Sequence, residues 1–153
     1  MATTDVLIKT IDMLQTVDNL YDFSAEVDKA TEALFKSGTI AEGSSEYSLY
    51  LAKITQGMLR DAACELLTGL KEDLTKTPKL LMTLAFKPDA KFTNQLFLWV
   101  KTTVGPNYLL ELAYDPDIIG GSVIVYNGLY KDFSLKKDMT RFFEDKNALQ
   151  TLF

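Results

Sequence analysis

Two short apolar runs on either side of an Asn-Gly pair constrain the fold of this 153-residue chain more than any other feature. Residues 122–126 and 129–133 are rich in β-branched, aromatic and other apolar side chains. Asn127-Gly128 supplies the two positive-φ positions of a type I′ turn, so the segment predicts a two-residue β-hairpin. The expected cross-strand pairs are Tyr126 with Leu129 and Val125 with Tyr130.

Turn and cap signals frame this hairpin. Asp115-Pro116 breaks the preceding chain, because aspartate and proline favour turns. Gly120-Gly121 stands just before the first strand, where a bulge or an unusual φ is expected. Ser134 is a suitable N-cap, which predicts a last helix with apolar residues on or near one face. Those apolar residues are Leu135, Met139, Phe142 and Phe143.

The chain before residue 87 has the apolar spacing of amphipathic helices, with steps of three and four residues. Thr77-Pro78 adds a helix-start signal, a Thr N-cap followed by Pro at the first helical position. We therefore expect a short helix after Pro78 that ends by Lys87-Pro88. The longer helices are expected at residues 5–20, at residues 24–37 with Ser24 as the N-cap, and at residues 47–74.

After residue 87 the spacing changes. Residues 92–104 keep a helical period, and residues 108–114 alternate with period two, as a strand with one buried face does. The predicted fold class is α+β and mostly helical. A helical bundle of residues 1–86 is followed by a unit of residues 87–153 that contains a β-hairpin or three-stranded sheet and flanking helices.

The composition argues against catalysis. Histidine is absent and there is one cysteine, which removes the commonest general base and zinc ligand and any thiolate cluster. No phosphate-binding glycine motif is present, and Asp115 and Asp117 flank a proline, where turn hydrogen bonds are typical. We expect no catalytic residue, no cofactor and no metal. The net charge of −5 argues against nucleic-acid binding.

The C-terminal pattern resembles a known family. The order Asp-Pro-x-Ile-Ile-Gly-Gly, apolar strand, turn, Asp-x-Ser and helix is similar to the C-terminal signature of the delta subunit of bacterial F-type ATP synthases, called the oligomycin sensitivity-conferring protein in mitochondria. Asp117, Ile118 and Phe133 stand where the family pattern has Ser, Leu and Gly. The N-terminal bundle is also shorter than the six helices usual there. The matching residues are Asp115, Pro116, Ile119, Gly120, Gly121, Asp132 and Ser134.

The resemblance implies a non-catalytic adaptor in the peripheral stalk. It would link the alpha subunits of the catalytic head to the b-type stator helices, so that the head resists rotor torque. The apolar face of the first helix is the candidate head contact, and the last helix with the chain end is the candidate stalk contact. The candidate residues are Leu7, Ile11 and Leu14 for the head, and Met139, Phe142, Phe143, Leu152 and Phe153 for the stalk.

The expected location follows from the same resemblance. The adaptor would sit at the cytoplasmic face of the inner membrane, attached through the complex without a span of its own. The first residues contain early acids and no arginine, so neither a signal peptide nor a transit peptide is expected. Three alternatives remain: a V-type ATPase E-like stalk subunit, a small-molecule-binding regulatory domain, and an unrelated helical scaffold.

Overall fold

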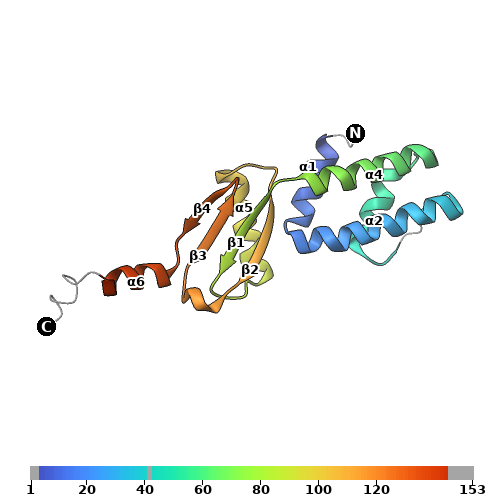
Figure 1. The fold of residues 1–153 in the computed structure, drawn as a ribbon. Coiled ribbons are helices and arrows are strands. Elements are labelled where there is room, and N and C mark those ends of the chain that lie inside the picture. Colours follow the sequence, from blue (N-terminus) through green and yellow to red (C-terminus); the bar gives the residue numbers. More distant parts are fainter. Residues whose placement is uncertain (1–3, 41–42, 145–153) are drawn as a thin grey trace. The chain divides into compact units, whose positions relative to one another are not determined.

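The computed structural model describes residues 4–40 and 43–144, without the side chains of residues 142–144. The chain divides into two compact units, Met1–Pro78 and Lys79–Phe153. The described residues form six α-helices and one four-stranded sheet, which confirms the α+β prediction (Figure 1). Unit 1 is helical, and unit 2 contains the sheet and two further α-helices.

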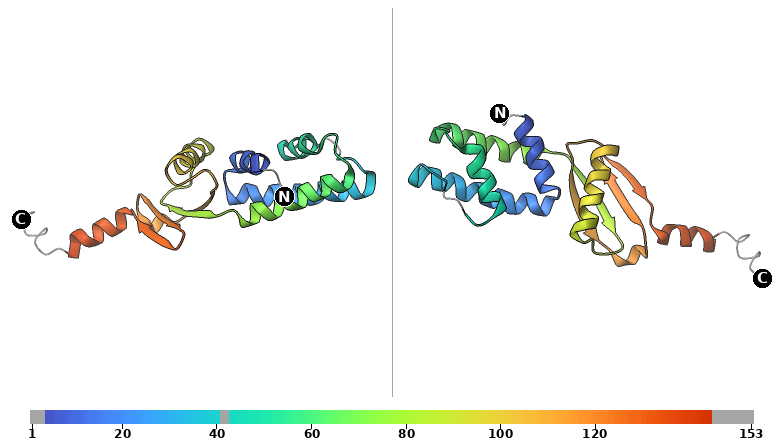
Figure 2. Two further views of the ribbon diagram at one scale, coloured as in Figure 1. Left: turned by 90° about the horizontal axis from the view of Figure 1, so that it is seen from above. Right: turned by 180° about the vertical axis from the view of Figure 1, so that it is seen from behind.

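Unit 1 is a two-layer helical bundle. The long helices α2 and α4 pack side by side, and α1 and α3 lie on one face of the layer that they form (Figure 2). The buried residues of α1, α2 and α4 are mostly apolar, as expected for amphipathic helices, whereas α3 buries Leu51 together with Ser48 and Thr55. The bounds are α1 Thr4–Leu14, α2 Val17–Ser37, α3 Glu46–Thr55 and α4 Arg60–Lys76.

Two helix boundaries predicted from spacing are wrong. The expected helix at residues 5–20 ends at Leu14, and α2 starts at Val17 with Thr16 as its N-cap in place of Ser24. The Thr16 hydroxyl accepts a hydrogen bond from the Asn19 amide at 3.3 Å. The Asn19 side chain donates to the Leu14 carbonyl at 2.7 Å. Side chains thus satisfy backbone groups at both helix ends, which stabilises the break.

The single helix expected at residues 47–74 is also interrupted. Gly57 has a φ of +77°, and residues 56–59 turn the chain from α3 into α4. A helix cannot continue through this left-handed conformation. The break places α3 and α4 in different layers of the bundle.

Unit 2 is built on a sheet of order β2-β1-β3-β4. β1 and β2 are parallel and are joined through α5, whereas β3 pairs antiparallel with both β1 and β4. α5 covers one face of the sheet, and α6 lies beyond the end of β4. The bounds are β1 Lys79–Leu84, α5 Ala90–Thr103, β2 Leu109–Tyr114, the 3₁₀ turn η1 Pro116–Ile118, β3 Ser122–Tyr126, β4 Leu129–Asp132 and α6 Leu135–Glu144.

The helix expected after Thr77-Pro78 is wrong, because Lys79–Leu84 is strand β1. Thr77 instead ends α4, with its hydroxyl donating to the Asp73 carbonyl at 3.0 Å. Leu80, Met82 and Leu84 alternate with more exposed residues and are buried on the face that α5 covers. A short apolar run fits a strand as well as a helix, so the sequence pattern did not decide between them. The unit boundary therefore falls at 78/79 instead of 86/87, and the sheet has four strands instead of two or three.

The hairpin prediction is confirmed in register and turn. Tyr126 pairs with Leu129, and Val125 pairs with Tyr130. The turn residues Asn127 and Gly128 have φ values of +47° and +73°. Local turn chemistry was thus sufficient to define this part of the sheet.

Candidate partner-binding site

The residues that carry the family resemblance gather near the start of α6. We use the name α6 base for Gly120, Gly121, Asp132, Phe133 and Ser134. The ends of β3 and β4 bring the glycine pair beside the Asp-x-Ser segment, although about ten residues separate them in sequence. The Phe133 amide donates to the Ser122 carbonyl at 2.9 Å and prolongs the ladder by one bond.

A set of hydrogen bonds fixes the first turn of α6. The Leu135 amide donates to the Gly120 carbonyl at 2.8 Å. The Ser134 amide donates to an Asp132 carboxylate oxygen at 2.8 Å, and the Ser134 hydroxyl accepts from the Lys137 amide at 3.3 Å. Ser134 is buried with 3% exposure, so its N-cap bond is shielded from competing water. The Leu135–Gly120 bond joins the first turn of α6 to the residue pair before β3, and the Asp132 and Ser134 bonds cap this turn locally.

The two glycines of the α6 base have different roles. Gly121 has a φ of +77°, and a Cβ there would overlap the Phe133 carbonyl oxygen. At Gly120 a Cβ would meet Leu135 at an ordinary 3.5 Å. The close crossing of the two backbones therefore requires glycine at position 121 only.

The Asp115-Pro116 turn leads into η1, which contacts α6. The Asp115 carboxylate accepts a hydrogen bond from the Asp117 amide at 2.9 Å and caps η1, as turn chemistry predicts. Ile118 is buried, and η1 contacts α6. Ile119 has a φ of +70° and is 55% exposed. The Asp115 carboxylate thus stabilises the backbone of the turn by capping η1.

We expect a pH-sensitive contact at Asp132. Hydrogen bonds from the Ser134 hydroxyl and amide lower the pKa of Asp132 below its ordinary value. A lowered pKa in the folded state means that the carboxylate stabilises the fold above the unfolded pKa of about 3.9, and that this stabilisation is lost as the pH falls through the folded pKa. In an NMR titration, Ser134→Ala should raise the Asp132 midpoint because the hydroxyl donor is lost.

Thr140→Ala is the matched control for this titration. Thr140 is exposed on the same helix, and its hydroxyl bonds to the Lys136 carbonyl at 2.9 Å, away from Asp132. The control should leave the Asp132 midpoint unchanged. Equal midpoints in the Ser134→Ala protein and the unmodified protein would contradict the assigned cause.

α6 presents an apolar stripe to solvent. Its residues from Leu135 to Arg141 are all exposed, including Leu135 at 47% and Met139 at 40%. An exposed apolar stripe on an amphipathic helix is typical of a surface that another helix covers. Of the candidate stalk residues, Met139 is therefore accessible. The side chains of Phe142 and Phe143, and all of Leu152 and Phe153, lie outside the described residues.

The predicted head contact on the first helix is corrected by the structure. Ile11 and Leu14 have 0% exposure and pack in the core of unit 1, and Leu7 is half-buried. The apolar face of α1 that was predicted to bind a partner packs against α2 and α4 instead. Ile11 and Leu14 are therefore core residues that a partner cannot reach in this conformation.

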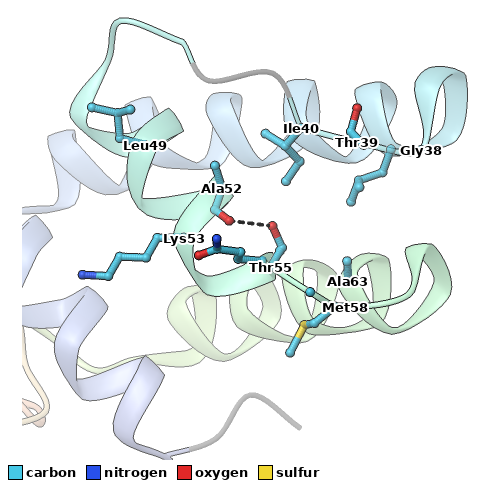
Figure 3. Close-up of a pocket in the computed structure, with 12 residues that line it drawn as sticks. Gly38, Thr39, Ile40, Leu49, Ala52, Lys53, Thr55, Met58 and Ala63 are labelled. Atoms are coloured by element: carbon cyan, nitrogen blue, oxygen red, sulfur yellow. Dashed lines mark hydrogen bonds between the residues drawn. The ribbon is translucent and has the colours of Figure 1, made fainter.

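Unit 1 instead has an open hollow of about 560 Å³ among the ends of α2, α3 and α4 (Figure 3). Leu49 and Met58 line it and are about half exposed, at 50% and 47%. The Thr55 hydroxyl donates to the Leu51 and Ala52 carbonyls, and Lys53 is the one ionisable residue among the described residues that line the hollow. The described lining is thus part polar and part apolar, and Leu49 and Met58 are its accessible apolar residues.

Unit 2 also has accessible apolar and aromatic residues on α5 that the sequence pattern did not single out as a site. Phe92, Leu96 and Trp99 of α5 line a groove beside the sheet. They differ from the buried α5 residues Phe97 and Val100. Apolar residues on two sides of one helix are the sequence signal for a second contact surface.

No protein-family model matches the chain, and no curated protein matches it. Within residues 4–40 and 43–144, no helix is both long and apolar enough to cross a membrane. The same residues contain no group of three or more Cys, Asp or Glu side chains placed to hold a metal ion.

Proposed function

We propose that the chain is a peripheral-stalk adaptor of an F-type ATP synthase, which links the alpha subunits of the head to b-type stator helices. The observation that carries the proposal is the α6 base. Four residues of the delta-like signature, namely Gly120, Gly121, Asp132 and Ser134, lie where an exposed amphipathic helix begins. We also propose that the chain has no catalytic role and couples the head to the stator mechanically.

The rigidity of the α6 base suits such an adaptor. A protein that resists torque must transmit force through fixed contacts. α6 is attached by the Gly120 carbonyl, the Asp132 carboxylate and the buried Ser134 cap, close to a four-stranded sheet. Its exposed apolar residues Leu135 and Met139, at i and i+4, can lie along a partner helix. The stator helix is accordingly the proposed partner of α6.

For the head contact, the hollow of unit 1 is the proposed surface in place of the first helix. Leu49 and Met58 border it and are accessible. Such a hollow can receive apolar side chains from a helical segment. Through these two contacts the adaptor would be peripheral to the membrane as part of the complex.

The test is co-purification from solubilised membranes. Tagged chain should recover alpha and b-type subunits, and Met139→Asp should lower recovery of the b-type subunit by about tenfold or more, because a charge is buried in an apolar contact. Thr140→Asp is the matched control, since it adds the same charge to an adjacent exposed position. Normal recovery with Met139→Asp would remove α6 from the interface. Absence of alpha and b-type subunits with the unmodified chain would refute the proposed function, and V-type subunits in their place would favour the E-like alternative.

A further inference from the structure

We propose that unit 2 has a second partner surface, which binds an amphipathic helix with acidic flanks. We call it the α5 groove, and we define it by Phe86, Phe92, Leu96, Trp99, Ile124 and Phe133. It is separate from the exposed stripe of α6. The proposal rests on the proposed function in one respect only, namely that the bound helix comes from a stalk partner.

The groove exists because α5 covers only part of its sheet face. Leu80 of β1 and Leu110 of β2 are fully buried, whereas Ile124 of β3 is only half-buried. Packed helices lie about 8–10 Å apart and strands about 4.8 Å apart, so one helix covers about two strands. Among the residues that the structure describes, no second helix covers the β3–β4 half of this face.

The lining is suited to apolar side chains. The hollow has a volume of about 450 Å³, and among its described lining residues the polar side-chain groups are the Ser122 hydroxyl and the Trp99 indole N–H. Three aromatic rings remain accessible, with Phe86 at 47%, Trp99 at 47% and Phe133 at 60% exposure. Phe86 and Phe92 stack edge to face with centroids 5.0 Å apart, which fixes one wall. Preformed apolar walls of this kind bind helix side chains at i, i+3 or i+4, and i+7.

The charges around the groove select an acidic helix. Lys87 directly follows Phe86, Lys91 directly precedes Phe92, and both are exposed. Lys131 is also exposed and is the register partner of Ile124, so it lies on the same face of the sheet. Asp89 and Asp132 accept hydrogen bonds from the Phe92 and Ser134 amides, at 2.7 and 2.8 Å. Hydrogen bonding leaves both carboxylates charged, so three lysines and two aspartates border the groove, and the excess of lysine favours Asp or Glu side chains on the partner.

The chain's own last helix is a poor occupant. The Leu135 amide bonds to the Gly120 carbonyl, and the Ser134 cap holds the first turn of α6 beyond the sheet. Turning α6 over the groove would break both contacts. α6 also has three basic residues from Leu135 to Arg141, namely Lys136, Lys137 and Arg141, which the lysines of the groove would repel.

Trp99 makes the proposal directly testable, because it is the only tryptophan of the chain and it lines the groove. The probes are two synthetic helical peptides with the same leucine stripe, one flanked by glutamate and the other by lysine. The glutamate peptide should shift Trp99 emission to shorter wavelength in a saturable way, with an affinity about tenfold or more above that of the lysine peptide. Equal affinities, or no shift with either peptide, would overturn the proposal.

Two variants of α5 locate the binding. Leu96→Glu places a charge in the lining and should weaken the glutamate peptide by about tenfold or more. Leu98→Glu adds the same charge at a 51% exposed position outside the lining and should have less than about a twofold effect. Circular dichroism must show that both variants are folded. If Leu96→Glu does not fold, Phe133→Glu, at a more exposed position of the groove, replaces it. Equal effects of the groove variant and Leu98→Glu would contradict the assigned site.

Two further results separate this proposal from its alternatives. The Trp99 emission could instead shift as the chain concentration rises, with a doubled mass in sedimentation and no response to either peptide. That result would assign the groove to a second copy of the chain and would overturn the proposal. Met139→Asp should bind the glutamate peptide normally, because α6 is not part of the groove. Peptide binding without recovery of stalk subunits would refute the proposed function and leave the α5 groove standing.

Discussion

Gly121→Val is expected to destabilise unit 2 by at least about 3 kcal/mol. Two costs add at this position. A β-branched residue is strained at a φ of +77°, and its Cβ would overlap the Phe133 carbonyl oxygen at the point where β4 leads into α6. Urea unfolding followed by Trp99 fluorescence reports on unit 2, because Trp99 belongs to α5. The midpoint should fall sharply, or the unit should fail to fold.

Gly128→Val separates the two costs. Gly128 has nearly the same φ, +73°, but a Cβ there meets no atom within 4 Å. Its substitution should therefore cost only the backbone strain, about 1–3 kcal/mol. Gly120→Ala should be tolerated, because its Cβ would make an ordinary contact with Leu135. Equal losses at positions 121 and 128 would show that the crossing with Phe133 does not require glycine.

Phe23→Ala is expected to destabilise unit 1 by about 3–5 kcal/mol. Phe23 of α2 has 0% exposure, and its side chain faces α3. Its ring meets Tyr47 edge to face, with centroids 5.6 Å apart, and is tilted against Tyr50 at 6.4 Å. Its removal leaves a cavity and ends both aromatic contacts. Far-UV circular dichroism during urea unfolding measures the loss.

Phe35→Ala is the matched control on the same helix. Phe35 is 65% exposed, so its truncation removes little buried area and should change stability by less than about 0.5 kcal/mol. A loss at Phe35 as large as that at Phe23 would mean that α2 buries a different face from the one described.

The sequence alone defined the parts of the fold that depend on local chemistry. The Asn127-Gly128 turn set the hairpin register, because a two-residue turn leaves only one pairing of its flanking strands. The Ser134 cap and the Asp115 turn were predicted for the same reason, since each depends on a side chain bonding to backbone within three residues. The α+β class followed from the change of period near residue 107.

The tertiary structure decided what local chemistry leaves open. Thr77-Pro78 satisfies a helix-start pattern, yet the apolar run after it became β1 because β2, β3 and α5 cover it. Ile11 and Leu14 form an apolar stripe whether a core or a partner buries it, and only packing shows that the core does. Exposure of the α5 groove depends in the same way on how much of the sheet α5 covers. Spacing records that a side chain is apolar, whereas long-range contacts decide which surface buries it.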